Sequence, residues 1–178
     1  MKELSAYIES LMQEHPENME QYLGEMVEIQ MQIHSKQVPK LSSLKDKMSR
    51  QINSLPIDEV KKYELLTRLE SMPKHNKLCH GNFMPENIIY NEKGMYVVDW
   101  IGARQGNASA DVGRTYLLLC LQDQKVADRY LDLFCQKSGT DLRYVQRWLP
   151  IVAAAHLPDA KAQEYDFLMR WVDVAEYQ

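Results

Sequence analysis

Hydrophobic residues recur at helical spacing through the first 72 residues of the chain. Pro16, Pro39 and Pro56 interrupt this pattern, and a proline inside a helix removes a hydrogen bond and clashes with the preceding turn. The stretch therefore predicts four helices, of which the second and the fourth (near 58–72) have the clearest apolar faces. These faces consist of Met19, Tyr22, Leu23, Met26, Ile29 and Ile33 in the second helix and Leu65, Leu66, Leu69 and Met72 in the fourth.

The pattern changes after Pro73. Residues 78–87 have no periodicity, and two short apolar runs at 88–90 and 95–100 flank the turn sequence NEKG. This arrangement predicts a loop followed by a β-hairpin.

Helical spacing returns in the last third of the chain. A polar, glycine-containing segment leads into an apolar helix over 114–121, for which Asp111 is the predicted N-cap. Three more helices are predicted near 124–137, 141–156 and 160–176. The buried face of the last one consists of Phe167 or Leu168 with Trp171 and Val172. Because we find no internal repeat or linker, residues 1–178 are predicted to form one mainly α (α+β) domain with a small hairpin.

Composition narrows the classes of partner. The net charge is −4 with acids and bases mixed along the chain, so no basic field attracts nucleic acid or anionic lipid. The longest apolar runs are far too short to span a bilayer. Three widely spaced cysteines fit reduced thiols better than a disulfide framework. We therefore predict a cytoplasmic protein with neither a nucleic-acid nor a membrane partner.

Candidate chemistry is concentrated in the loop and hairpin, where five of the seven glycines also fall, between residues 81 and 113. His80, Gly81 and Asn82 are followed five residues later by Asn87 and then by Asp99 at the end of the second apolar run. A kinase needs a residue that orients the acceptor hydroxyl, followed by oxygen ligands for Mg²⁺. Asn87 and Asp99 carry hard oxygens of that type, and Mg²⁺ takes its other ligands from water and nucleotide phosphates.

The segment CHGNFMPENIIYNEKGMYVVDWIGARQGNASADVGRTYLLL resembles the catalytic core of the aminoglycoside phosphotransferase and choline kinase-like family, distant relatives of the protein kinases. That family has a His-Gly-Asp loop, an Asn five residues after the Asp, and a later Ile/Val-Asp-Phe/Trp metal motif. The likeness extends over most of the chain from about Met19 onward. It implies a fold corresponding to the helical C-terminal lobe of a protein kinase-like enzyme.

The resemblance also implies an activity and roles for single residues. The activity is transfer of the ATP γ-phosphoryl group to a small-molecule hydroxyl acceptor. Asn87 and Asp99 take the positions of the Mg²⁺ and nucleotide ligands, and Asn82 takes the position of the catalytic aspartate. His80 braces the catalytic loop, and Asp111 hydrogen-bonds back to that loop.

The chain departs from the family in two respects. Asn82 replaces an aspartate, and an amide cannot act as a general base near neutral pH. Before residue 80 the only glycine, Gly24, lies in a helical pattern, and no alternating stretch suggests strands. The N-terminal lobe, with its phosphate-covering loop and lysine, is therefore predicted to be absent. Its loss predicts an exposed apolar patch on the cleft face, available for a partner or a homodimer.

These two departures predict little or no kinase activity for this chain alone. Two alternatives stay open. One is a pseudoenzyme or binding module that recognises a partner through its acceptor pocket or cleft face. The other is a kinase fragment whose nucleotide lobe comes from another chain or a longer product. The acceptor itself does not follow from the sequence, because one fold handles many hydroxyl compounds.

Overall fold

The computed structural model describes residues 6–173, which contain eight α-helices, five short strands and three 3₁₀ turns. The helices are α1 (Ile8–Glu14), α2 (Met19–His34), α3 (Leu44–Asn53), α4 (Glu59–Ser71), α5 (Ala108–Gln122), α6 (Gln124–Ser138), α7 (Leu142–His156) and α8 (Ala162–Asp173). The strands are β1 (Ala6–Tyr7), β2 (Lys77–Cys79), β3 (Ile88–Asn91), β4 (Gly94–Val97) and β5 (Arg104–Gly106). The 3₁₀ turns are η1 (Pro16–Asn18), η2 (Pro85–Asn87) and η3 (Leu157–Asp159). The prediction of a mainly α protein is confirmed.

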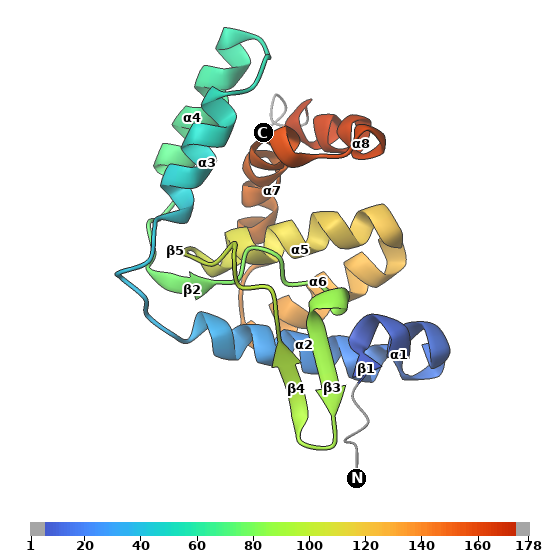
Figure 1. Ribbon diagram of the computed structural model, residues 1–178. Helices are drawn as coiled ribbons and strands as arrows, with labels where there is room; N and C mark the ends of the chain where they lie inside the picture. The colour runs from blue at the N-terminus through green and yellow to red at the C-terminus, as the bar shows by residue number, and fades with distance from the viewer. Residues whose placement is uncertain (1–5, 174–178) are drawn as a thin grey trace.

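The four predicted N-terminal helices are present as α1 to α4. Pro16 opens the 3₁₀ turn between α1 and α2, and the other two prolines lie in the connections that follow α2 and α3. Ser43 and Asp58 cap the next two helices by accepting hydrogen bonds from first-turn N–H groups. The paired helices α3 and α4 stand at one end of the molecule, and the β3–β4 hairpin points away from the other (Figure 1).

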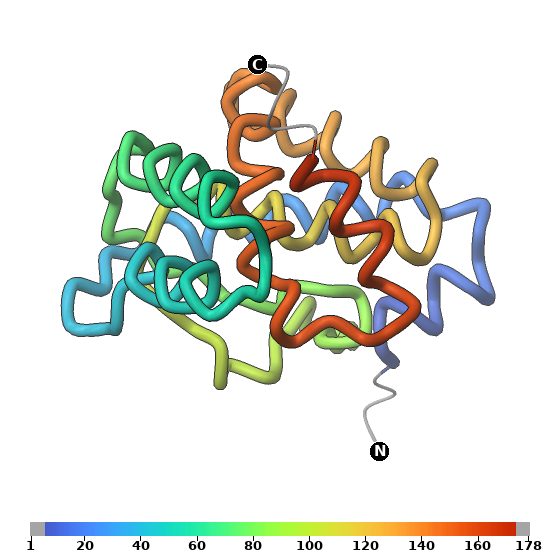
Figure 2. The backbone as a smooth tube through the Cα atoms, turned by 90° about the horizontal axis from the view of Figure 1, so that it is seen from above, coloured from blue at the N-terminus to red at the C-terminus, as the bar shows by residue number. Residues whose placement is uncertain are grey.

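Helix α5 forms the centre of the core. It packs against α6 on one side and against α7 on another, while α2 covers α6 and α8 packs on α7 (Figure 2). Gly113 allows the close approach of α7, because a Cβ at this position would lie 3.3 Å from a methyl carbon of Leu149. In α8, Leu168 and Val172 are fully buried as predicted, whereas Trp171 is only partly buried and packs against the core. Residues 174–176 of the predicted last helix lie outside the described residues.

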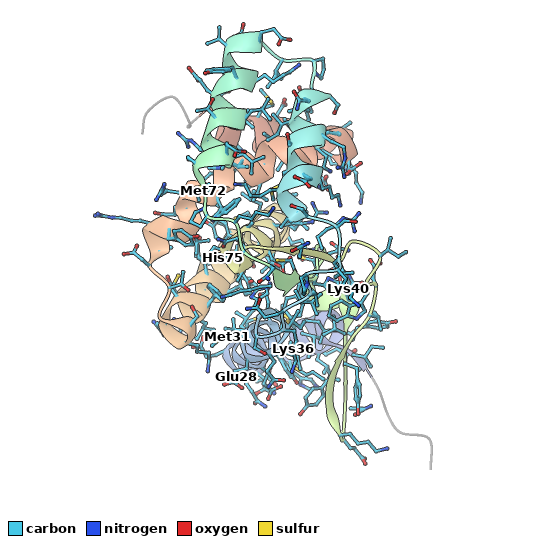
Figure 3. The ribbon with its side chains drawn as sticks, turned by 90° about the vertical axis from the view of Figure 1, so that its left-hand side faces the viewer. Glu28, Met31, Lys36, Lys40, Met72 and His75 are labelled. Carbon is cyan, nitrogen blue, oxygen red and sulfur yellow. The ribbon has the colours of Figure 1, made fainter. Side chains whose placement is uncertain are left out.

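The strands form two small sheets. The predicted hairpin is confirmed as β3 and β4, and β1 adds to it in the order β1-β3-β4. The second sheet pairs β2 with β5 in antiparallel fashion, and the chain after α2 runs beside β2, with the Leu78 N–H donating to Lys36 O (2.8 Å; Figure 3). The sequence did not predict β1, β2 or β5, because two or three residues are too few to establish an alternation.

The predicted N-cap of α5 is wrong. The helix begins at Ala108, and Asn107 is its cap, with Oδ1 accepting from the Ser109 N–H at 2.9 Å. Asp111 lies inside the first turn of α5 and is 2 % exposed. Its carboxylate accepts hydrogen bonds from the loop after β2 and leaves the capping position to Asn107. Within residues 6–173, no helix combines the length and apolar character needed to cross a membrane.

Candidate active site

The loop after β2 is held by the imidazole ring of His80. The ring is fully buried, its Nδ1 accepts from the Asn82 N–H (3.0 Å), and its Nε2 donates to Val98 O (2.9 Å). These partners define a neutral ring with its proton on Nε2. His80 therefore joins the loop after β2 to the residue before Asp99, which confirms the predicted bracing of this loop.

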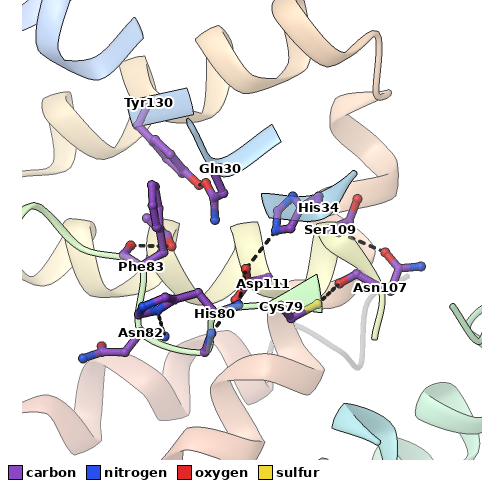
Figure 4. Close-up of polar contacts among 12 residues, drawn as sticks. Gln30, His34, Cys79, His80, Asn82, Phe83, Asn107, Ser109, Asp111 and Tyr130 are labelled. Carbon is purple, nitrogen blue, oxygen red and sulfur yellow. Dashed lines mark hydrogen bonds and ion pairs between the residues drawn. The ribbon is translucent and has the colours of Figure 1, made fainter. Parts of the chain in front are cut away.

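The carboxylate of Asp111 fixes the same loop from the side of His34 (Figure 4). Its Oδ2 accepts from His34 Nε2 (2.8 Å) and from the His80 N–H (3.1 Å), and its Oδ1 accepts from the Gly81 N–H (2.9 Å). Burial by itself raises the pKa of Asp111. The hydrogen bond and electrostatic attraction of His34, together with the two backbone N–H groups, outweigh burial and hold this pKa below its ordinary value. The predicted contact between Asp111 and the loop is confirmed.

Two residues that the sequence analysis missed also support the loop. His34, the last residue of α2, is 5 % exposed and reaches Asp111 from a helix 77 residues earlier. The Thr115 hydroxyl on α5 donates to Phe83 O at 2.8 Å. A polar residue at the end of an apolar helical stripe was the only signal for His34. Nothing in the local sequence distinguishes Thr115 from a packing residue.

The structure brings the three predicted site residues together around Asn82. The Asn82 amide donates from Nδ2 to Asp99 Oδ2 (3.3 Å), and the Asn87 amide donates from Nδ2 to Asn82 O (2.9 Å). Asn87 ends the 3₁₀ turn before β3, and Asp99 follows β4, so the hairpin joins the two. Because the amide nitrogen of Asn87 is used within the loop, its oxygen is left to serve as a ligand.

The backbone at Asp99 is unusual. Its φ angle is 61°, the only positive value for a non-glycine residue between residues 6 and 173. This conformation costs free energy in a residue with a Cβ and persists where the surroundings impose it. The exposed Trp100 beside it packs edge-to-face on the His80 ring and donates from Nε1 to Val97 O (2.9 Å). These contacts hold the Asp99 carboxylate at the mouth of the loop.

The donor set suits a Mg²⁺ ion. Asn87 and Asp99 offer an amide oxygen and an exposed carboxylate, and Mg²⁺ prefers such hard oxygen ligands. Among the described residues, no lysine, arginine or histidine nitrogen lies within 4.0 Å of the Asp99 carboxylate, so its charge is not already neutralised by an ion pair. Asn82 contributes a neutral amide to this site, whereas an aspartate at position 82 would add a second negative charge. The site therefore carries one carboxylate for a divalent cation.

Gly81 is required by the loop geometry. Its φ angle is +86°, and an added Cβ would lie 2.6 Å from the carbonyl oxygen of Gly102. We expect Gly81→Ala to lower the free energy of unfolding by ~1–3 kcal/mol, because the backbone must shift or strain. Gly24→Ala is the matched control: it lies in α2 with only Lys137 Cε near, at 3.7 Å. In urea unfolding the control should keep or gain stability, and equal losses in both variants would contradict this account of the loop.

The sequence model of the phosphotransferase enzyme family (APH) matches residues 8–148. Among solved structures, LicA in complex with AMP is 12% identical with a TM-score of 0.67, over 98% of this chain and 67% of that one. The choline kinase LicA from Streptococcus pneumoniae is 13% identical with a TM-score of 0.64, over 90% of this chain and 65% of that one. The chain thus spans about two thirds of the length of these proteins.

No curated protein sequence matches the chain significantly. The two solved structures are similar to this chain in structure but low in sequence identity, so they show a shared fold alone, that of a kinase-like protein with a helical lobe. The family match covers well over half of the chain and includes His80, Asn82, Asn87 and Asp99. The chain therefore belongs to the phosphotransferase enzyme family.

Proposed function

We propose that this chain is the metal- and acceptor-binding lobe of a small-molecule kinase, which transfers the γ-phosphoryl group of ATP to a hydroxyl. In this proposal Asn87 and Asp99 hold Mg²⁺, and Asn82 orients the acceptor hydroxyl without removing its proton. When bound, the metal would offset the charge that develops on the nucleotide phosphates. The observation that carries the proposal is the meeting of Asn87 and Asp99 at Asn82, on a loop fixed by His80 and Asp111.

The comparisons with known proteins support nucleotide binding by a small-molecule kinase in general terms. One similar structure contains AMP, and another is a choline kinase. We propose that the phosphate-covering lobe that completes such a cleft is supplied from outside residues 6–173, by another chain or a longer product. This chain by itself then has little or no turnover, because it contains neither that lobe nor a general base. We propose that it acts in the cytoplasm.

One observation favours a pseudoenzyme as the second candidate. The amide of Asn82 donates to the carboxylate that would bind the metal. An amide in this position stabilises the loop without a cation, whereas two carboxylates would need one. A binding module that no longer turns over substrate would keep such a residue.

The apolar patch predicted on the cleft face has candidate members near the site. Ile101 is 91% exposed, and Trp100, Tyr7 and Tyr96 are also exposed. Tyr7 and Tyr96 lie opposite Ile89 on its two neighbouring strands, so their side chains are on the same face of the sheet. A partner or a second copy on this face stays a prediction.

Metal-dependent nucleotide binding tests the proposed function. We expect a non-hydrolysable ATP analogue to bind more tightly with Mg²⁺ than without it in isothermal titration. Asp99→Asn should weaken nucleotide binding in the presence of Mg²⁺ by about tenfold or more, because it removes the only carboxylate assigned to the metal. The control Asp166→Asn changes an exposed carboxylate on α8 and should leave it unchanged. Nucleotide binding that is equally strong without Mg²⁺, or unaffected by Asp99→Asn, would contradict the proposal.

A further inference from the structure

A narrow cleft opens beside the catalytic loop, between α3, α5 and α7. Gly81 and Gly102 form the wall next to Asn82. The polar lining consists of Lys47, Gln51, Asp111, Arg114 and His156. The free volume is about 30 Å³, whereas a cavity needs roughly 10–15 Å³ to hold one water molecule. The cleft therefore has room for one small polar group, placed directly beside the residue that follows Gly81.

Arg114 brings into this cleft a positive charge that has no ion-pair partner among the described residues. Its Nη1 donates to His156 Nδ1 at 2.8 Å, and its Nε is buried without a hydrogen-bond partner. No carboxylate of the described residues lies within 4.0 Å of the guanidinium. Burial and the nearby Arg114 charge lower the pKa of His156 to about 4, so His156 accepts the hydrogen bond as a neutral ring. This partly buried arginine thus has no carboxylate at ion-pair distance.

Lys47 adds a second cation to the same cleft. Its side chain is half-buried, and within residues 6–173 it also has no carboxylate within 4.0 Å. Burial, followed by repulsion from Arg104 and Arg114, lowers the pKa of Lys47. The nearby acids attract these cations without forming an ion pair with either. Asp111 exerts the largest attraction on Arg114, followed by Asp159 and Glu164. The carboxylate of Asp111 is itself hydrogen-bonded to His34 and two backbone N–H groups.

The lining favours a carboxylate over the other small groups. No Phe, Tyr or Trp side chain lines the cleft, whereas quaternary ammonium groups are bound in aromatic cages. A planar carboxylate matches the fork of a guanidinium and suits the small free volume better than a tetrahedral phosphate. The two cations repel a cationic acceptor. The cleft therefore differs in character from a site for choline.

On the basis of the proposed function, we propose that this cleft binds the carboxylate of the acceptor, so that the acceptor is a small hydroxy acid. With its carboxylate between Arg114 and Lys47, the acceptor would extend past Gly81 toward Asn82. Its hydroxyl would then lie at the site that Asn82, Asn87 and Asp99 form. The reaction proposed above would phosphorylate that hydroxyl and leave the carboxylate free.

Ligand binding without nucleotide or metal tests this assignment. The unfolding midpoint of the full chain would be measured at constant ionic strength with glycolate, glycerate or malate, and with glycerol, choline chloride, inorganic phosphate and sodium chloride. We expect at least one of the three hydroxy acids to raise the midpoint saturably, and glycerol and choline to leave it unchanged. No effect of any hydroxy acid, or an equal effect of glycerol, choline or phosphate, would overturn the assignment.

Two variants and a control locate the binding. Arg114→Gln and Lys47→Gln should each weaken hydroxy-acid binding about tenfold or more, because each removes one charged donor. Lys47 is half-exposed, so Lys47→Gln keeps the test valid even if Arg114→Gln fails to fold. Arg143→Gln, at an exposed position on α7, should bind as the unmodified chain does. Unchanged binding by Lys47→Gln would place the acid elsewhere and overturn the assignment.

These measurements separate the two proposals. Saturable hydroxy-acid binding without Mg²⁺-dependent nucleotide binding supports the cleft assignment and contradicts the kinase function. Phosphorylation of choline, without any effect of the hydroxy acids, supports the kinase function and overturns the cleft assignment.

Discussion

Asp111→Asn should lower the free energy of unfolding by ~3–5 kcal/mol, because it removes a buried charge on which a hydrogen-bond network depends. The carboxylate accepts three hydrogen bonds, from His34 and from the backbone N–H groups of His80 and Gly81. An amide in its place offers one acceptor oxygen and turns an NH₂ group toward the remaining donors. Urea unfolding at neutral pH measures the loss, and Asp132→Asn, an exposed change on α6, should stay within about 0.5 kcal/mol of the unmodified chain.

The stabilisation that Asp111 provides also depends on pH in a defined direction. The fold holds the Asp111 pKa below its ordinary value, so the unfolded chain binds a proton at this residue more readily. The stabilisation is fully present above the unfolded pKa, about 4, and is lost as the pH falls through the lower folded value. The unfolding curves of the unmodified chain and of Asp111→Asn should therefore converge in acid. A loss under about 1 kcal/mol at neutral pH, or a gap that widens in acid, would contradict the role given to Asp111.

Asn82→Asp should raise phosphoryl transfer from Mg·ATP. Restoring a general base is worth on the order of 10²- to 10⁴-fold. We expect the lower end of that range, because a loose transition state depends more on positioning and charge than on proton removal. A radiolabelled ATP assay with the hydroxy acids above compares the variant with Asn82→Ala, which lacks both the amide and the base. Ordinary kinase rates in the unmodified chain would contradict the prediction.

The same variant gives a second readout that does not need turnover. Asn82 Nδ2 lies 3.3 Å from Asp99 Oδ2, so Asn82→Asp places two carboxylates next to each other. Without a cation they repel, and Mg²⁺ relieves the repulsion. The unfolding midpoint of Asn82→Asp should therefore rise with Mg²⁺ more than that of the unmodified chain or of Asn82→Ala. Equal Mg²⁺ responses in all three proteins would contradict the geometry of the site.

The elements that the sequence predicts well are those in which one face is buried over several turns. The stripes of α2 and α4 and the alternation around the NEKG turn are long enough to specify a helix or a hairpin. The site residues follow from order and spacing, and the hydrogen bonds from Asn82 and Asn87 confirm that these positions converge.

The parts that sequence reasoning missed depend on long-range contacts. Strand β2 is defined by its pairing with β5, which begins 25 residues after β2 ends. The contact of His34 with Asp111 requires α2 and α5 to pack, and no local pattern records it. Asp111 was assigned as an N-cap because an acid before an apolar run is typical of one. Asn107 takes that position because the helix starts one turn earlier.

Paramagnetic broadening of NMR signals by Mn²⁺ tests the proposed metal site most directly. Mn²⁺ replaces Mg²⁺ at oxygen sites and broadens the NMR signals of nearby nuclei. With a non-hydrolysable ATP analogue present, we expect the side-chain amide signals of Asn82 and Asn87 to broaden first, at Mn²⁺ levels that leave the exposed Asn53 at the end of α3 sharp. Broadening that begins elsewhere, or that affects all asparagines equally, would contradict the claim that Asn82, Asn87 and Asp99 form one metal-nucleotide site.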